Sequence, residues 1–182
     1  MRGQPSPKQS HVPPVVVIGV GNILLSDEGV GVHVIRTLCR RRTPRHIEFV
    51  DGGTGGLALL DVMRHRRRVV IVDAIAAKGP PGAVFRWCPT GPEETRAWSR
   101  SAHMEGILEV LRVGKMLFEL PSLVCIGIVP MDTVTLSVRL SRELRRRLPT
   151  ISRLVLREAL SNETFFMDRL TISHPGRLAQ GV

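Results

Sequence analysis

The sequence predicts an α/β protein, in which a single three-layer α/β/α sandwich is built on a mostly parallel sheet of about five strands. Short apolar, β-branched runs without polar alternation, such as residues 15–18, are typical of strands covered on both faces. These runs alternate with segments of helical spacing, which are long enough to connect parallel strands. The 182 residues suffice for one domain that buries about 70% of its unfolded surface.

The first strand, residues 15–18, runs into a glycine turn at the sheet edge where open α/β sheets hold their ligands. Residues 28–41 carry apolar side chains at helical spacing. This segment predicts the first crossover helix, with Ser26 or Asp27 as its N-cap.

The second strand is expected at residues 47–51, where it leads into a turn with four glycines at residues 52–56. A helix over residues 57–64 should then lead to a third buried strand, residues 69–73. Both strands end in an aspartate. Two strands therefore deliver an acidic side chain to the carboxyl edge of the sheet.

A short strand is expected at residues 83–87, as an antiparallel edge. The irregular segment that follows, residues 88–102, is long for a loop inside a compact domain, which favours a functional role. A helix over residues 104–113 leads to a strand at 123–128.

The last helix is expected at residues 140–160, interrupted at Pro149. The pattern predicts the domain over residues 14–162, between a flexible N-terminal tail of residues 1–13 and a C-terminal tail of residues 163–182. An odd count of three cysteines without a secretory signal favours a reducing compartment, so we expect a cytoplasmic protein. No run approaches the roughly 18 apolar residues of a membrane span.

The net charge of +10 raises nucleic-acid binding as one alternative function, because clustered arginines can neutralise phosphates. The clusters are Arg40 to Arg42, Arg66 to Arg68 and Arg145 to Arg147. The chain has no tyrosine and only two tryptophans, which argues against a stacking platform for single strands. A basic proteome or an acidic protein partner explains the charge better, and we expect no nucleic-acid partner.

A nucleotide or small-molecule binding α/β domain is the second alternative, because a glycine turn follows the first strand. The third glycine of G-x-G-x-x-G would fall at Leu24, however, and no acid follows the next strand at the spacing of a ribose ligand. A pyrophosphate at the helix N-terminus would also face Asp27 and Glu28. The order of residues favours a metal or cation site over a phosphate site.

Glu28, Asp73 and His103 all follow strand ends or begin helices at one edge of the predicted sheet, so they can converge. One imidazole and two carboxylates suit a borderline divalent ion such as Ni²⁺ or Zn²⁺. Each residue also has an ordinary structural interpretation. Glu28 can be a solvated acid of a first helical turn, Asp73 a cap or turn residue, and His103 a loop histidine.

The turn from Asp51 to Thr54 has a structural interpretation as a cap for the second helix. Its glycines, Gly52 and Gly53 among them, leave backbone groups bare, so an extended peptide could approach and hydrogen-bond there. The nucleophile and zinc-protease signatures G-x-S-x-G and H-E-x-x-H are absent from the chain.

Five segments in this order resemble the hydrogenase maturation endopeptidases, over residues 15–159 of the chain. They read GVGNILLSDEGVGVHVI, DGGTGGLALL, VVIVDAI, SAHMEGILEVL and GIVP. The resemblance implies an aspartic-type endopeptidase that removes a C-terminal extension from the large subunit of [NiFe] hydrogenase after nickel insertion. It implies the large-subunit precursor as partner, nickel supplied by that substrate and no organic cofactor, and we expect a monomer.

By the same resemblance, Glu28, Asp73 and His103 would coordinate the nickel used in substrate recognition. Glu28 and Asp73 are also the expected catalytic carboxylates, with Asp51 as a candidate acid–base helper. The Asp51 to Thr54 turn, which includes Gly52 and Gly53, corresponds to the family's D-G-G-T signature, implicated in recognition or cleavage. Three positions depart from the family pattern: Ala102, Met104 and Met131.

Overall fold

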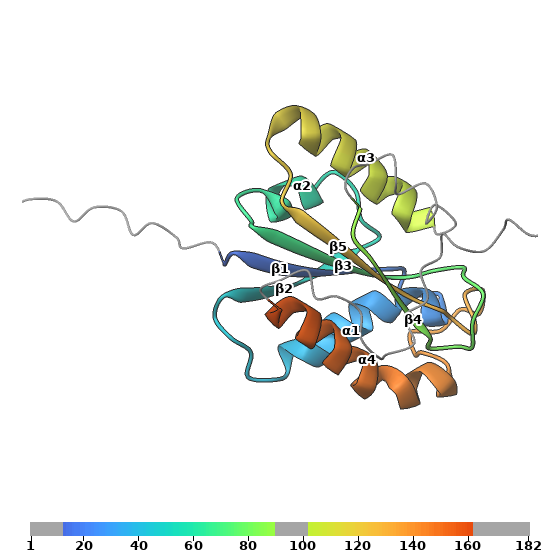
Figure 1. Cartoon of the computed structure of the whole chain (residues 1–182). Coiled ribbons are helices and arrows are strands. Elements are labelled where there is room, and N and C mark those ends of the chain that lie inside the picture. The colour runs from blue at the N-terminus through green and yellow to red at the C-terminus, as the bar shows by residue number, and fades with distance from the viewer. Residues whose placement is uncertain (1–12, 90–101, 162–182) are drawn as a thin grey trace, which may run out of the picture.

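The computed structural model describes residues 13–89 and 102–161 of the chain (Figure 1). Its five strands are β1 (Val15–Val20), β2 (Ile47–Gly53), β3 (Arg68–Ala74), β4 (Val84–Trp87) and β5 (Ser122–Ile128). The helices are the 3-10 turn η1 (Ser26–Gly29), α1 (Val30–Cys39), α2 (Leu59–Met63), α3 (Ala102–Leu117) and α4 (Arg142–Leu160).

The strands form one sheet in the order β2-β1-β3-β5-β4, and every neighbouring pair is parallel except β4 with β5. Helices α1 and α4 cover one face of this sheet, and α2 and α3 cover the other (Figure 1). The predicted α/β fold with a mostly parallel five-stranded sheet is therefore confirmed, including the antiparallel edge strand.

The two faces of each central strand feed two separate core layers. Val15 and Val17 of β1 belong to the core under α1 and α4, whereas Val16 and Ile18 belong to the core under α2 and α3. All residues of β1 and β3 are buried. This double coverage is the reason why the two strands carry apolar runs with no polar alternation.

Glycines bring α1 unusually close to the sheet. A Cβ atom on Gly19 would lie 2.2 Å from the carbonyl oxygen of Gly31, and one on Gly31 would lie 2.2 Å from that of Val72. At Gly21, where φ is +139°, a Cβ would lie 2.0 Å from the carbonyl oxygen of Glu28. The glycines of this motif are thus required for close packing and for a tight turn, independently of any phosphate.

The start of the first helix differs from the prediction. Helix α1 begins at Val30 with Gly29 as its N-cap, and neither Ser26 nor Asp27 caps it. Both residues lie in η1 and are buried. The Asp27 carboxylate binds amides elsewhere in the chain, so it is not available for the helix.

The predicted interruption of the last helix is wrong, because α4 continues through Pro149. Pro149 is exposed, so water can satisfy the carbonyl group that loses its helical partner. On the opposite side, Leu144, Ile151 and Val155 are buried against the sheet. Burial of this apolar face offsets the missing hydrogen bond.

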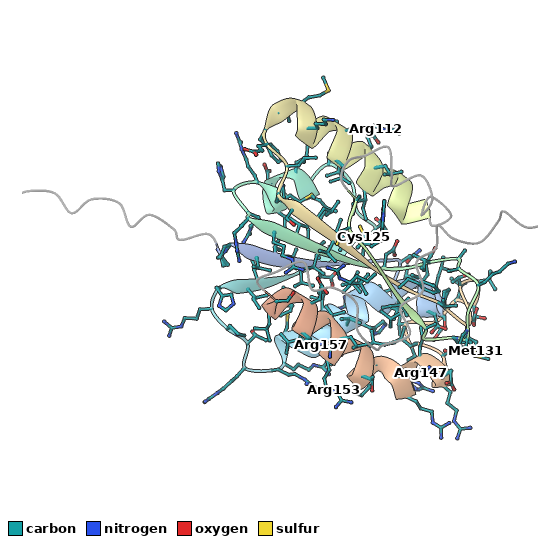
Figure 2. The ribbon with its side chains drawn as sticks, viewed as in Figure 1. Arg112, Cys125, Met131, Arg147, Arg153 and Arg157 are labelled. Atoms are coloured by element: carbon teal, nitrogen blue, oxygen red, sulfur yellow. The ribbon has the colours of Figure 1, made fainter. Side chains whose placement is uncertain are left out.

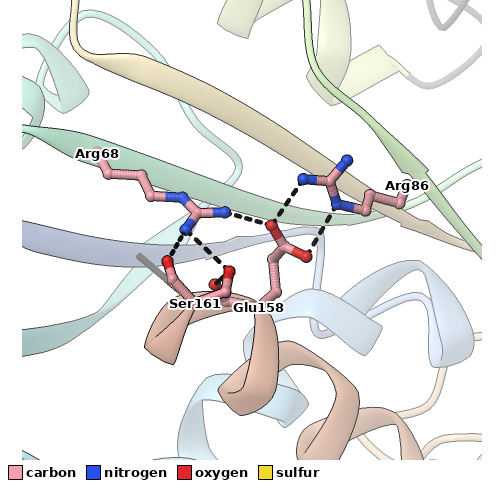
Figure 3. Close-up of polar contacts among 4 residues, drawn as sticks. All are labelled: Arg68, Arg86, Glu158 and Ser161. Carbon is pink, nitrogen blue, oxygen red and sulfur yellow. Dashed lines mark hydrogen bonds and ion pairs between the residues drawn. The ribbon is translucent and has the colours of Figure 1, made fainter. Parts of the chain in front are cut away.

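An ion-pair cluster joins β3, β4 and the end of α4 near the amino edge of the sheet (Figure 3). The Glu158 carboxylate accepts from Arg68 and, at 2.9 and 3.0 Å, from Nε and Nη2 of Arg86. Arg68 also donates to the carbonyl oxygen and, at 3.1 Å, to Oγ of Ser161. Nearby, Arg66 pairs with Glu48 at 2.6 Å.

Two arginines of the Arg66 to Arg68 cluster are therefore engaged within the fold. Arg68 is buried, so it does not belong to an exposed basic surface. Burial of a guanidinium group requires an acidic partner, and Glu158 provides it from 90 residues away in sequence. Among the described residues, no helix is long and apolar enough to cross a membrane.

Candidate active site

The sheet order places β1 between β2 and β3. The connection from β1 to β2 runs through α1 on one face, and the connection from β2 to β3 runs through α2 on the other (Figure 1). From β1 the chain goes to β2 on one side and then crosses to β3 on the other side, so the strand order reverses at β1. Open α/β sheets bind their ligands at such a switch point.

Asp73 lies at this edge, as the penultimate residue of the central strand β3. It is paired in register with Gly127 of β5, and it is only 1% exposed. One carboxylate oxygen, Oδ1, accepts from the backbone amide of Ala74 at 2.8 Å. Asp73 is thus a buried strand residue, and a carboxylate in such a position is costly to keep without compensating contacts.

Glu28 lies in η1, the turn that follows β1, and its side chain is half-buried. The turn η1 contacts β3, the strand that carries Asp73. The carbonyl oxygen of Glu28 faces Gly21 so closely that only glycine fits there. The fold therefore brings the elements that carry Glu28 and Asp73 together at the carboxyl edge.

His103 is the second residue of α3, and its side chain lies outside the described part of the structure. The first turns of α3 lie beside the glycine-rich turn that follows β2, since a Cβ on Gly106 would lie 4.0 Å from the amide nitrogen of Gly56. The N-terminus of α3 is thus at the same edge. Among the described side chains, which do not include that of His103, no three His, Cys, Asp or Glu residues lie close enough together to hold a metal ion. The ligand set of Glu28, Asp73 and His103 stays a prediction.

The turn after β2 is held by the Asp51 side chain. Its Oδ2 accepts from Nε and Nη2 of Arg36 at 3.2 and 3.1 Å, and its Oδ1 accepts from the amide of Gly53 at 3.1 Å. The carbonyl oxygen of Gly53 in turn accepts from Gly21 at 2.7 Å. These contacts hold the turn together, but the expected cap of the second helix is wrong, because the N-cap of α2 is Ala58 and no side chain caps it. An acid–base role for Asp51 stays a prediction.

The same turn presents open backbone. Gly53 and Gly56 have φ values of +52° and +105°, and a Cβ on either would meet no atom within 4 Å. Thr54, between them, is exposed. An extended peptide can therefore reach this backbone without steric hindrance from side chains at the two glycines.

Asp27 is a structural residue that the sequence analysis missed. Its fully buried carboxylate accepts from three backbone amides of the loop between β5 and α4: Met131 at 3.0 Å, Asp132 at 3.1 Å and Ser141 at 2.7 Å. An aspartate before a helical segment indicates an N-cap just as well, so the sequence carries no signal for these partners more than 100 residues away.

The described cysteines near the sheet are poor nucleophiles. Burial raises the pKa of the Cys125 thiol and that of Cys88. Both thiols are therefore protonated at neutral pH, and a thiol must lose its proton to attack.

Similarity to known proteins identifies the family of this chain. The profile of the hydrogenase maturation protease family matches residues 32–158, which is more than half of the chain. This chain belongs to the hydrogenase maturation protease family. This protein is therefore an endopeptidase, and neither the nucleotide-binding nor the nucleic-acid-binding alternative is supported.

This chain is 35% identical over 119 residues to the hydrogenase 2 maturation protease of Escherichia coli K12, a match that covers 64% of this chain and 73% of that protein. Among solved structures, the hydrogenase maturating endopeptidase HybD from E. coli superposes with a TM-score of 0.71 at 31% identity, over 80% of this chain and 93% of that one. The [NiFe] hydrogenase maturation protease HybD from Thermococcus kodakarensis superposes with a TM-score of 0.68 at 27% identity, over 80% and 98%.

Proposed function

We propose that this protease removes the C-terminal extension from the large-subunit precursor of a [NiFe] hydrogenase once that precursor carries nickel. The observation that carries the proposal is the meeting of three features at one sheet edge. The elements of Asp73 and Glu28 contact one another there, and an open glycine turn lies beside the start of α3. Membership of the hydrogenase maturation protease family supports this class of substrate.

The nickel belongs to the substrate, and Glu28, Asp73 and His103 would complete its coordination. Two carboxylates and one imidazole are ligands that Ni²⁺ accepts readily. Asp73 would contribute from the rigid end of β3, whereas Glu28 and His103 come from the turn after β1 and the start of α3. A precursor without nickel would lack the group that these ligands bind. The proposal thus explains how cleavage would wait until the metal is in place.

Metal binding would fix the position of the nearby scissile bond. Gly52, Gly53 and Thr54 would then bind the extended segment beside it, and the segment would share or displace the hydrogen bonds that Gly53 makes with Asp51 and Gly21. Holding the reacting groups in one geometry supplies much of the rate of such a reaction. Hydrolysis adds water across the peptide bond, so the carboxyl product takes the hydroxyl group and the leaving amine takes a proton.

The carboxylates would carry the proton transfers, which makes this an aspartic-type, metal-binding endopeptidase. Glu28 and Asp73 are the proposed catalytic pair. Asp51 is a candidate acid–base helper, although Arg36 and the Gly53 amide occupy its oxygens in this conformation. The protonated thiols of Cys88 and Cys125 support carboxylate chemistry over attack by cysteine. We further propose that the protease works as a monomer in the cytoplasm.

The direct test compares a nickel-loaded large-subunit precursor with the same precursor prepared without nickel. Each is mixed with the protease, and mass spectrometry follows the loss of the C-terminal peptide. We expect cleavage of the loaded form alone. Equal cleavage of both forms would overturn the role of nickel, and cleavage of neither would overturn the proposed substrate.

A further inference from the structure

The loop between β5 and α4 presents apolar side chains to solvent. Five of the nine exposed large apolar side chains among the described residues lie on this loop or on the turn beside it. They are Leu24, Met131, Val134, Leu136 and Val138, here called the apolar loop face. Val134 and Leu136 are each 82% exposed. A concentration of apolar groups of this kind on a folded protein marks an interaction site.

The loop is held in place by polar contacts, although its apolar groups contribute little to the core. Ser137 donates to the carbonyl oxygen of Leu24 and accepts from the amide of Ser26, both at 2.9 Å. Asp132 accepts from the amides of Val134 and Thr135, at 3.1 and 3.0 Å. The three amides bound by the buried Asp27 carboxylate fix both ends of the loop. A surface fixed in advance loses little entropy on binding.

The position of the apolar loop face connects it to the proposed active site. Leu24 belongs to the turn that leads into η1, and Ser137 bridges to Leu25 in that turn. Glu28 follows three residues later. The turn that carries Glu28 is thus hydrogen-bonded to the loop, so a protein whose C-terminal segment reaches Glu28 has the apolar loop face close enough to bury.

Arginines surround the end of the loop. The side chains of Arg139, Arg142, Arg145 and Arg146 are exposed, and within residues 13–89 and 102–161 none of them forms an ion pair with an acidic side chain. Figure 2 shows Met131 and Arg147 at the same end of the molecule, whereas Arg153 and Arg157 lie farther back along α4. An apolar centre with a basic border matches a partner that has an apolar patch bordered by acidic side chains.

We propose that the apolar loop face, with its arginine border, is the docking surface for the folded body of the hydrogenase large-subunit precursor. This inference rests on the proposed function, and it assigns to the protease a second contact with its substrate, separate from nickel and from the cleaved segment. The precursor surface that docks there is apolar at its centre and acidic at its border.

The first test replaces two exposed apolar residues in each of two places. Val134→Ser with Leu136→Ser alters the apolar loop face, and Met116→Ser with Leu117→Ser is the control at the far end of α3. The control residues are equally apolar, at 85% and 65% exposure, and lie at the opposite edge of the sheet. We expect the Kd for the nickel-loaded precursor to rise about tenfold or more in the loop variant and to stay within about twofold in the control. Melting temperatures show that both variants fold.

The second test separates charge from apolar contact. Arg142→Gln with Arg146→Gln alters the border, and Arg153→Gln with Arg157→Gln removes a pair of the same spacing about 16 Å farther along α4. That separation exceeds the Debye length of about 8 Å at physiological salt. We expect only the border variant to associate more slowly and to lose salt dependence, because surface charges act mainly on the association rate.

Binding and cleavage are recorded on the same samples, so the two proposals can fail separately. A loop variant that binds like the wild type overturns the docking surface and leaves the proposed function intact. A wild type that binds the loaded precursor without cleaving it overturns the proposed function, while the Kd series still decides the docking surface. No binding overturns both. If the wild type sediments as a dimer that the loop variant dissociates, the occupant is a second copy, which also contradicts the inference.

Discussion

The two edges of the sheet use polar side chains in different ways. Near the amino edge, arginines from separate elements share one carboxylate, Glu158, and tie β3 and β4 to the end of α4. At the carboxyl edge, the strands end in acids such as Asp73, and glycine turns leave their backbone open. The contrast teaches that burial alone does not mark a functional charge. Glu158 and Asp73 differ in position: Glu158 ties β3 and β4 to α4 near the amino edge, whereas Asp73 lies at the carboxyl edge, where open α/β sheets bind their ligands.

The largest effect should come from removing a proposed nickel ligand. Glu28→Gln and His103→Ala should each lower cleavage of the nickel-loaded precursor by about two to three orders of magnitude, because a positioned ligand group is lost. Cleavage is followed by mass spectrometry of the released peptide. Circular dichroism should show an intact fold in both variants, and full activity in either would remove that residue from the site.

At the other edge, Glu158→Gln should lower stability and spare the active site. Two arginines would lose their shared partner, at a cost of about 3 kcal/mol in the free energy of unfolding. Glu143→Gln is the matched control on the same helix, because it removes an exposed pair with Arg147 worth about 0.3–0.5 kcal/mol. Urea unfolding measures both. Equal losses would show that the Glu158 cluster has no special role.

Asp27 and Glu28, which are neighbours in η1, should differ in the same way: one acid is structural and the other belongs to the proposed active site. Asp27→Asn should lower the free energy of unfolding by about 2 kcal/mol, since the buried carboxylate serves three amides. Glu28→Gln should change it by less than about 0.5 kcal/mol. Denaturant titration of the two variants side by side gives the answer. A larger loss in Glu28→Gln than in Asp27→Asn would reverse the roles assigned to them.

A smaller effect on stability should come from His33, which lies on α1 behind the loop between β5 and α4. Burial, followed by the charge of Arg36, lowers the pKa of His33 below 6.5. The unfolded chain then takes up this proton at a higher pH than the folded chain. Stability should therefore fall as the pH drops below 6.5 toward the folded-state pKa. Urea midpoints at pH 7.5 and 5.5 should differ less in His33→Gln, and an unchanged difference would exclude this group.

The sequence alone allowed prediction of the sheet and of the edge where the site lies. Apolar runs without polar alternation identified β1 and β3. The ends of the predicted strands placed Asp51 and Asp73 at the carboxyl edge. Local patterns failed where the partner is distant. Asp27 resembles an N-cap in sequence but binds amides more than 100 residues away. Arg68 belongs to a cluster of arginines that looks exposed in sequence, and its ion pair with the distant Glu158 cannot be predicted locally. Pro149 by itself predicts a helix break. The helix continues because its apolar face packs against the sheet, and such tertiary contacts cannot be seen in a local sequence pattern.

The division of labour between the two edges can be tested in one crossed experiment. Asp73→Asn and Glu158→Gln are placed in the same two assays, thermal unfolding and cleavage of the nickel-loaded precursor at a temperature where both are folded. We predict that Asp73→Asn keeps its melting temperature and loses cleavage, while Glu158→Gln melts lower and cleaves normally. Normal cleavage by Asp73→Asn would contradict the assignment of the carboxyl edge as the site of hydrolysis.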